Sequence, residues 1–294
     1  AFDTLAIRTN APAVVTVPNP LAGRWYVTPT NTTAATAGLV TLRASLSANA
    51  PRPPFGGYFN SARSGHGLFL YPASGVWAGL WFTYLQDGSP TWYYLQAPAP
   101  GANGHWRAPI YRSTWNGRGN RLVAVGEATL VPNLAPSPGG FVFSYTLDGE
   151  SGSEAFIDFG GSCPSIDGNR VDVAGHWFDP ARAGSGYSVQ LFPNAEFYAA
   201  FVYDARGVAR FLDAQRGGLG ATVSALDLTQ LRGFCPLCVR SGNPTRTIVG
   251  RLQRTVGAGR LTRITTDGAF VDGVPGRWTS DDAVTPLGIT KGCL

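Results

Sequence analysis

The segment Gly56-Gly-Tyr-Phe-Asn-Ser-Ala-Arg-Ser-Gly-His-Gly67 returns as Gly175-His-Trp-Phe-Asp-Pro-Ala-Arg-Ala-Gly-Ser-Gly186, an offset of 119 residues (175 − 56). The offset continues without a gap for about forty residues. The identical pairs include Gly56/Gly175, Phe59/Phe178, Ala62/Ala181, Arg63/Arg182, Gly65/Gly184, Gly67/Gly186, Phe82/Phe201, Tyr84/Tyr203 and Gly88/Gly207. A repeat of this length indicates one structural module used twice. We predict a first module at residues 55–170 and a second at 171–294, after an N-terminal extension and Pro-rich linker at 1–54.

Strand-like runs follow the repeated segment, and the turns between them contain Gly, Pro, Asn or Asp. In the first module these runs cover residues 67–72, 76–85, 91–96, 105–111, 121–131, 141–147 and 154–159. Connections as short as Gln86-Asp87-Gly88 suit hairpins, and no ten-residue stretch shows helical periodicity. We therefore predict an all-β fold of two tandem antiparallel meander modules, each a small barrel or sandwich.

The composition sets limits on location and partners. Lys291 is the only lysine, the net charge is +5, and no basic run exceeds two residues, so a nucleic-acid partner is not indicated. The chain begins at Ala1 and contains no Met, so we expect a leader-processed protein at the cell surface or outside the cell. The longest apolar run, residues 76–85, is about half of what a membrane-spanning helix needs, and no membrane span is predicted.

Alternation of side chains along strands allows the faces of the two copies to be compared. One face is apolar in both copies, with Leu68/Tyr187, Leu70/Val189, Ala78/Phe197, Leu80/Ala199, Phe82/Phe201 and Tyr84/Tyr203, and we assign it to the interior of each module. The other face carries Phe69, Tyr71, Trp77 and Trp81 in the first copy but Ser188, Gln190, Glu196 and Ala200 in the second. The first module is thus predicted to have an additional aromatic face.

Three explanations of this aromatic face stay open. It can be covered by the second module or by the N-terminal extension, it can form a subunit contact, or it can be a platform for sugar rings or bases. Phe69, Tyr71, Trp77 and Trp81 are the candidate binding residues, with Arg63 and His66 as polar groups beside them. Burial of one such side chain is worth about 2–3 kcal/mol, so four of them require a partner of some kind.

The Arg63-Ser-Gly-His-Gly67 element and its copy at Arg182 resemble a phosphate-binding loop only superficially. Phosphate loops open helices, whereas these glycines lead into strands, so no helix dipole is present to bind an anion. We interpret the element as a bend before a strand. Arg63 and Arg182 are then expected to fix this bend by binding carbonyl groups or an acidic neighbour such as Asp179.

The four cysteines are predicted to form structural disulfides, Cys235 with Cys238 and Cys163 with Cys293. Cys235-Pro-Leu-Cys238 lies in residues 222–264, the part of the second copy that has diverged from the first. A redox motif needs a helix N-terminus, and a zinc site needs further ligands, but no His lies within fifty residues of Cys235. No metal site and no cofactor are predicted.

No catalytic residue set is recognisable in the sequence. His66, His105 and His176 are the only histidines, and the repeat places Ser185 opposite His66 and Gly57 opposite His176, so we interpret all three as surface residues. The carboxylates Asp148, Glu150, Glu154 and Asp158 cluster around one hairpin. Such charges are usually solvated, although two of them about 5–10 Å apart in a cleft would suit a glycosidase. An enzyme is therefore not the favoured interpretation.

The words Trp177-Phe-Asp-Pro-Ala-Arg-Ala-Gly-Ser-Gly186 and Trp81-Phe-Thr-Tyr84, followed by Gly88-Ser-Pro-Thr-Trp92, resemble a tandem β repeat of secreted Gram-negative bacterial proteins. That repeat is an uncharacterised module, sometimes attached to secreted hydrolases, and the resemblance implies secretion but no activity. The opening Gly175-His-Trp-Phe-Asp is also similar to the first strand of the avidin barrel, which implies a meander barrel and nothing about its ligand.

Three functional hypotheses follow. In the first, the aromatic first module of a secreted, non-enzymatic protein binds a macromolecular partner, either a glycan or a cell-surface component. In the second, copies of the chain assemble into an extracellular filament or surface layer, because the β-prone extension, with residues 11–17 and 38–46, adds a strand to a neighbouring copy. In the third, the protein is a hydrolase that uses its carboxylates or His66.

Overall fold

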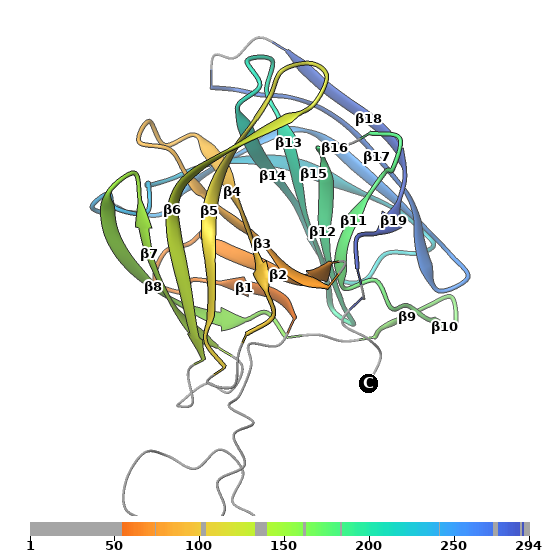
Figure 1. Ribbon diagram of the computed structural model, residues 1–294. Coiled ribbons are helices and arrows are strands. Elements are labelled where there is room, and N and C mark those ends of the chain that lie inside the picture. The colour runs from red at the N-terminus through yellow and green to blue at the C-terminus, as the bar shows by residue number, and fades with distance from the viewer. Residues whose placement is uncertain are drawn as a thin grey trace, which may run out of the picture.

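The computed structural model describes residues 55–73, 75–100, 104–132, 140–160, 163–182, 184–240, 242–272, 276–288 and 290. The predicted strands of the extension, residues 1–54, lie outside this set. Within it every regular element is a β-strand, and two barrel-like sheets stand side by side (Figure 1). The predicted all-β class with two tandem modules is confirmed.

The first module is a closed barrel of eight strands in chain order, each antiparallel to the next, and β1 pairs with β8 to close it. Its strands are β1 (Gly56–Phe59), β2 (Gly67–Ala73), β3 (Val76–Tyr84), β4 (Pro90–Pro98), β5 (Trp106–Trp115), β6 (Asn120–Pro132), β7 (Phe141–Leu147) and β8 (Glu150–Asp158). The interior is filled by aromatic and aliphatic side chains, among them Trp81, Trp106 and Phe143. Closure leaves the first module without an open sheet edge along most of its length.

A short hairpin, β9 (Ser165–Ile166) and β10 (Asn169–Arg170), precedes the second module. The second sheet contains β11 (Gly175–Phe178), β12 (Gly186–Phe192), β13 (Ala195–Tyr203), β14 (Ala209–Gly217), β15 (Val223–Arg232), β16 (Thr245–Gly257), β17 (Arg260–Ala269), β18 (Arg277–Ala283) and β19 (Thr285–Pro286). Only Val284 separates β18 from β19, and β19 pairs with β11. The last part of the chain thus returns to the first strand of the module, as β8 returns to β1 in the first.

The repeat predicted from the sequence corresponds strand by strand. β1–β4 and β11–β14 begin 119 residues apart (for example 186 − 67), β5 and β15 begin 117 apart (223 − 106), and β6 and β16 begin 125 apart (245 − 120). The second copy therefore gains its extra residues between β15 and β16. This is the loop that carries Cys235 and Cys238.

The predicted division of faces in β2 and β3 is wrong. The hairpin pairs Leu68 with Trp81 and Phe69 with Leu80, so an even-numbered residue of β2 lies opposite an odd-numbered residue of β3. Directly opposite residues share a face. The face that we assigned to the interior, with Leu68 and Leu80 together, therefore combined residues from both sides of the sheet.

The two modules meet through the same face of each. Phe82 packs against Phe211 with ring centroids 5.5 Å apart, and Trp92, the counterpart of Phe211, packs against Phe201, the counterpart of Phe82, at 5.9 Å. Polar contacts repeat the relation, because Thr91 donates to Ala209 O at 3.0 Å while Arg210 donates to Pro90 O at 3.4 Å. When each residue of a contact is replaced by its counterpart 119 residues away, the result is the other contact of the pair. The modules are therefore related like the two subunits of an isologous dimer.

Two main-chain hydrogen bonds at the rim of this interface are also related by the repeat. Trp115 N donates to Gly207 O at 2.9 Å, and Gly233 N donates to Gly88 O at 3.0 Å. Gly88 and Gly207 are a repeated pair, and each lies in the turn before the fourth strand of its module. The end of the fifth strand of each module thus reaches across to the other module. Of the face that we assigned to the interior, the β3 and β13 residues, such as Phe82 and Phe201, thus lie at the interface between the modules, whereas Leu68 and Leu70 of β2 lie inside the first barrel.

Candidate functional site

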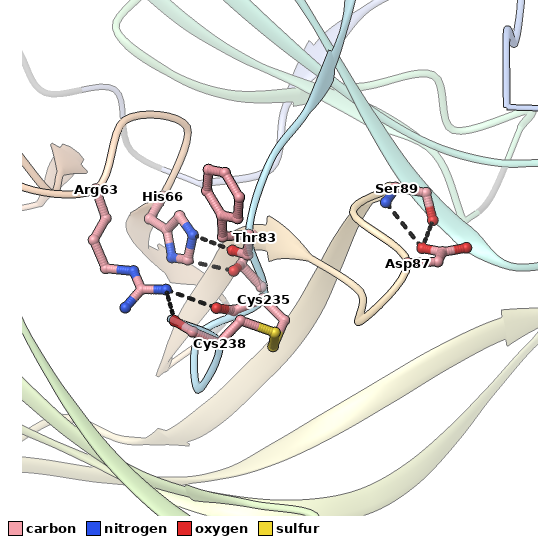
Figure 2. Close-up of a disulfide and its surroundings, with 8 residues drawn as sticks. Arg63, His66, Thr83, Asp87, Ser89, Cys235 and Cys238 are labelled. Carbon is pink, nitrogen blue, oxygen red and sulfur yellow. Dashed lines mark hydrogen bonds between the residues drawn. A yellow bond between two sulfur atoms is a disulfide. The ribbon is translucent and has the colours of Figure 1, made fainter. Parts of the chain in front are cut away.

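The β15–β16 loop of the second module covers the mouth of the first barrel. Cys235 and Cys238 form the predicted disulfide within it. Arg63 Nη2 donates to Cys235 O at 2.7 Å and to Cys238 O at 2.9 Å, and His66 Nε2 lies 2.8 Å from Phe234 O (Figure 2). The expectation that Arg63 binds carbonyl groups is confirmed, although these carbonyls belong to the other module.

The two predicted polar residues, Arg63 and His66, therefore lie together at this mouth. His66 is only 2% exposed, so its interpretation as a surface residue is wrong. Its Nε2 faces a carbonyl oxygen, which can only accept, so this nitrogen carries a proton. His66 Nδ1 lies 3.2 Å from Thr83 Oγ1 and 3.3 Å from Glu154, and Asn60 Nδ2 donates to Glu154 Oε2 at 2.7 Å.

Glu154 corrects a second expectation, because it is 4% exposed and fully engaged, whereas Asp148 and Glu150 at the same hairpin are exposed. The second module has a carboxylate at the matching place. Asp282 accepts from Arg182 Nη1 at 3.1 Å and from the Tyr187 hydroxyl at 2.5 Å. Arg182 thus binds Asp282, and not the predicted Asp179, through its side chain. Both carboxylates hold the end of a barrel together, which is a structural function.

The remaining histidines differ from each other. His105 is exposed as predicted, whereas His176 is half-buried at the interface between the modules. His176 Nδ1 lies 3.0 Å from Ser188 Oγ, and its ring contacts Tyr71 and Phe201. Burial lowers the pKa of His176 to about 3, so the imidazole is neutral at physiological pH.

A cleft of about 510 Å³ opens beside the disulfide loop, between the two modules. Its lining residues are Tyr84, Leu85, Gln86, Asp87, Tyr93, Arg112, Leu147, Asp148, Cys235 and Pro236. They come from β3 and its following turn, from β4 and β5, from the end of β7 and the β7–β8 turn, and from the β15–β16 loop. The second module contributes the last two of these residues, Cys235 and Pro236.

Aromatic and charged groups meet in this cleft. Arg112 Nη2 donates to Asp148 Oδ2 at 2.5 Å, and both side chains are about half exposed. Burial raises the pKa of the Tyr93 hydroxyl, with Arg112 partly opposing this effect, so Tyr93 remains a neutral donor and acceptor. Burial also raises the pKa of Tyr84. Tyr84 and Tyr93 are only 1% and 4% exposed, so the groups that the cleft offers to a ligand are mainly the half-exposed guanidinium and carboxylate.

Asp87 supplies a further carboxylate at the edge of the cleft. Desolvation pulls its pKa upward, but hydrogen bonds from the Ser89 hydroxyl and amide, with the charges of Arg210 and Arg232, lower the pKa below its usual value. Ser89 N and Ser89 Oγ donate to Asp87 Oδ1 at 2.9 Å and 2.5 Å. Asp87 is therefore anionic, and its turn is rigidly held.

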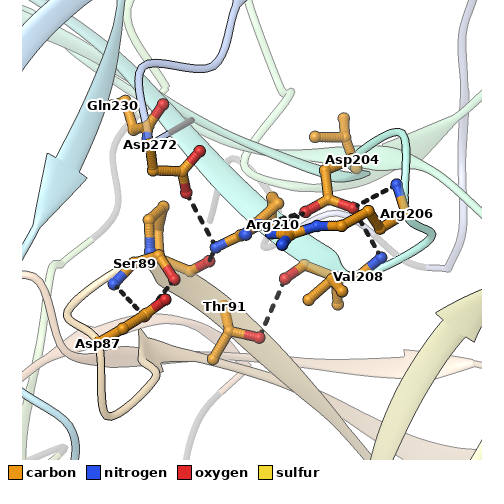
Figure 3. A network of polar contacts seen from close by, with 12 residues as sticks. Asp87, Ser89, Thr91, Asp204, Arg206, Val208, Arg210, Gln230 and Asp272 are labelled. Carbon is orange, nitrogen blue, oxygen red and sulfur yellow. Dashed lines mark hydrogen bonds and ion pairs between the residues drawn. The ribbon is translucent and has the colours of Figure 1, made fainter. Parts of the chain in front are cut away.

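A buried charge network fixes this turn against the second module (Figure 3). Arg210 is 1% exposed and lies between two carboxylates, with its Nε 2.9 Å from Asp204 Oδ2 and its Nη1 3.1 Å from Asp272 Oδ2. The same guanidinium donates to Pro90 O in the first module. The position of the β3–β4 turn, and with it one wall of the cleft, is therefore set by charges of the other module.

The four residues predicted to form an aromatic binding face do not share one face. Trp77 and Trp81 lie inside the first barrel with Leu68 and Leu70, at 6% and 0% exposure. Phe69 and Tyr71 lie at the interface between the modules, at 0% and 3% exposure. The predicted single platform is not formed. Of the three explanations, cover by the second module applies to Phe69 and Tyr71.

The cleft residues were only partly visible in the sequence. Tyr93 belongs to the excess of aromatics in the first copy, and Asp148 belongs to the carboxylate hairpin. Arg112 carries no local signal, because nothing in the sequence places it opposite Asp148.

Cys163 is disulfide-bonded, and its predicted partner Cys293 lies outside the described residues.

Across the described ranges no group of three or more His, Cys, Asp and Glu side chains could hold a metal ion. The same part of the chain contains no helix with the length and hydrophobicity needed to cross a membrane. No family model matches this chain, and neither a curated protein nor a solved structure shows significant similarity to it.

Proposed function

We propose that the protein binds a saccharide of a glycan or cell-surface polymer in the cleft at the mouth of the first barrel, without catalysing a reaction. The observation that carries this proposal is the half-exposed Arg112–Asp148 pair, with the anionic Asp87 at its edge, in a volume of about 510 Å³. The hydroxyl groups of a saccharide both donate and accept, so they can accept from the guanidinium and donate to the carboxylates. The volume lies within the range of ligand pockets.

Binding in place of catalysis is supported by the state of the buried groups. His66 and Glu154 bind each other and neighbouring residues, and the disulfide loop covers them. The exposed charges of the cleft, Arg112 and Asp148, form an ion pair. Such a pair can exchange its hydrogen bonds for hydrogen bonds with the hydroxyl groups of a ligand. A structural disulfide close to the surface supports an oxidising environment, and we propose an extracellular or cell-surface location.

Replacement of Arg112 by alanine is expected to weaken saccharide binding at least about tenfold, because a charged hydrogen bond to a ligand is worth about 1.5–3 kcal/mol. A glycan array followed by titration of the positive saccharides measures this loss. Arg107 is the matched control, since it lies on the same strand and pairs with Glu127 away from the cleft. Absence of binding by the wild-type protein, or equal losses for Arg112→Ala and Arg107→Ala, would refute the proposed cleft.

A free strand edge favours a second candidate function, self-assembly by strand addition. β5 pairs with β6 from Asn120 onward, whereas β7 pairs with β6 only from Gly126. Within the described part of the chain, residues 120–124 therefore have one strand neighbour, and Leu122 and Val123 are 40% and 43% exposed. Such an edge can accept a strand from another chain. As an alternative to the saccharide proposal, residues 1–54 of a neighbouring copy would supply that strand.

Electron microscopy of concentrated protein tests this candidate. We expect fibres or rings for the wild type, and dispersed particles for Val123→Lys, because a charge on an edge strand opposes pairing. Val239→Lys is the control, since Val239 is 90% exposed in the β15–β16 loop, away from this edge. Dispersed wild-type particles at all concentrations would eliminate the self-assembly candidate.

A further inference from the structure

A second, smaller cavity lies between the modules and shares no lining residue with the saccharide cleft. It has a volume of about 80 Å³. The first module contributes Phe59, Phe82 and Phe159, and the second contributes Phe197, Phe211 and Asp213. Phe59, Phe159 and Phe197 are half-buried and form the mouth, whereas Phe82, Phe211 and Asp213 are buried and form the floor. The cavity is therefore an aromatic slot with a single carboxylate at its base, and Arg246, which pairs with that carboxylate, also lines it.

The carboxylate of Asp213 is only half satisfied. Asp213 is 3% exposed, its Oδ2 accepts from Arg246 Nη2, and its Oδ1 has no hydrogen-bond partner among the described residues. The Arg246 guanidinium also binds the Gln215 amide oxygen, in the orientation that satisfies both groups. Arg246 is thus engaged twice, while one oxygen of a buried carboxylate is unpaired. Such an orphaned acceptor is costly unless something donates to it.

This arrangement is specific to one side of the pseudo-symmetric interface. The residue at the position of Asp213 in the first module is Tyr94 (213 − 119), and the counterpart of Phe197 is Ala78. Neither the symmetric packing of the modules nor the barrel interior requires a carboxylate here, because Asp213 lies on the outer face of β14, alternating with the interior residues Leu212 and Ala214. The combination of rings and carboxylate therefore needs an explanation outside the fold.

We propose that this slot binds a primary ammonium group on a short alkyl chain, with the ammonium on Asp213 Oδ1 and the chain between the phenylalanine rings. An ammonium group donates to a carboxylate and is attracted to aromatic faces. A volume of about 80 Å³ is more than one water molecule needs and leaves room for a small group such as ethylammonium. A larger amine would place its alkylammonium end in the slot, and the rest of the molecule would extend out through the mouth. This proposal does not depend on the saccharide cleft.

Titration calorimetry with ethylammonium chloride at constant ionic strength tests the proposal, with ethanol as the neutral probe of equal size. We expect millimolar affinity for ethylammonium, because three heavy atoms cannot supply more, and at least tenfold weaker binding of ethanol. Asp213→Asn should weaken ethylammonium binding at least tenfold, whereas Asp227→Asn, which alters an exposed carboxylate on β15, should leave it unchanged. A thermal melt of each variant confirms that it is folded.

A pH series on the wild-type protein gives a readout that needs no variant. Burial raises the pKa of Asp213 to about 6, with Arg246 opposing the shift. Arg246 and Tyr84 are the other ionisable groups that act on it, and burial raises the pKa of Tyr84 above its usual value. Ethylammonium affinity is therefore expected to fall as the pH is lowered through about 6, where Asp213 becomes neutral. No binding by the wild type, equal binding by Asp213→Asn, equal affinity for ethanol, or a flat pH series would each overturn the proposal.

Discussion

Replacing Arg254 by methionine is expected to lower the free energy of unfolding by about 3–5 kcal/mol, because it leaves a buried carboxylate without its counter-charge. Arg254 and Glu196 are 0% and 1% exposed. Arg254 Nη2 lies 2.9 Å from Glu196 Oε1 and Nε lies 3.2 Å from Oε2. The Tyr198 hydroxyl donates to the same carboxylate at 2.7 Å. Urea unfolding at pH 7 measures the change.

The guanidinium of Arg254 also joins the end of the second barrel to its loop. It donates to the carbonyl oxygens of Gly220, Ala221 and Thr222, which precede β15. Arg251 on the same strand is the matched control, because its ion pair with Asp227 is exposed and such pairs are worth about 0–1 kcal/mol. Similar losses for Arg254→Met and Arg251→Met would show that burial of the pair does not decide its contribution.

Gly207→Ala is expected to cost about 3 kcal/mol or more and to loosen the contact between the modules. Gly207 has a φ of 74°, and a Cβ there would lie 1.9 Å from Trp115 O, the backbone of the opposite module. The left-handed conformation alone costs about 1–2 kcal/mol for a residue with a Cβ, and overpacking adds about 1–3 kcal/mol. Relief of the clash requires the β5–β6 loop to move away.

Gly218→Ala separates the cost of the left-handed backbone conformation from the cost of the clash with the opposite module. Gly218 has a φ of 79°, and a Cβ there would meet nothing within 4 Å, so only the conformational cost applies. Thermal unfolding monitored by tryptophan fluorescence compares the two variants, and limited proteolysis of the β5–β6 loop reports the loosening. If Gly207→Ala destabilises the protein no more than Gly218→Ala, the contact of Trp115 with Gly207 is not important for docking of the modules.

The candidate sites are formed by residues that lie far apart in the sequence. The repeat made Phe82, Tyr84, Phe201 and Tyr203 conspicuous as identical positions, but an apolar strand face looks the same whether it fills a barrel or joins two barrels. The saccharide cleft joins Arg112 and Asp148 from separate hairpins to Cys235 of the other module. The slot at Asp213 depends on rings from both modules. No spacing along the chain encodes such distances.

Local chemistry by itself determined the all-β class, the duplicated module, most strand positions and the Cys235–Cys238 disulfide. These features depend on alternation, turn residues and short separations along the chain, all of which can be read from neighbouring residues. Only the tertiary structure decided which face points inward, because face assignment requires the register between strands, and a shift of one residue reverses it. The burial of His66 and Glu154, and the docking of the modules through their shared face, likewise depend on contacts between residues far apart in the chain.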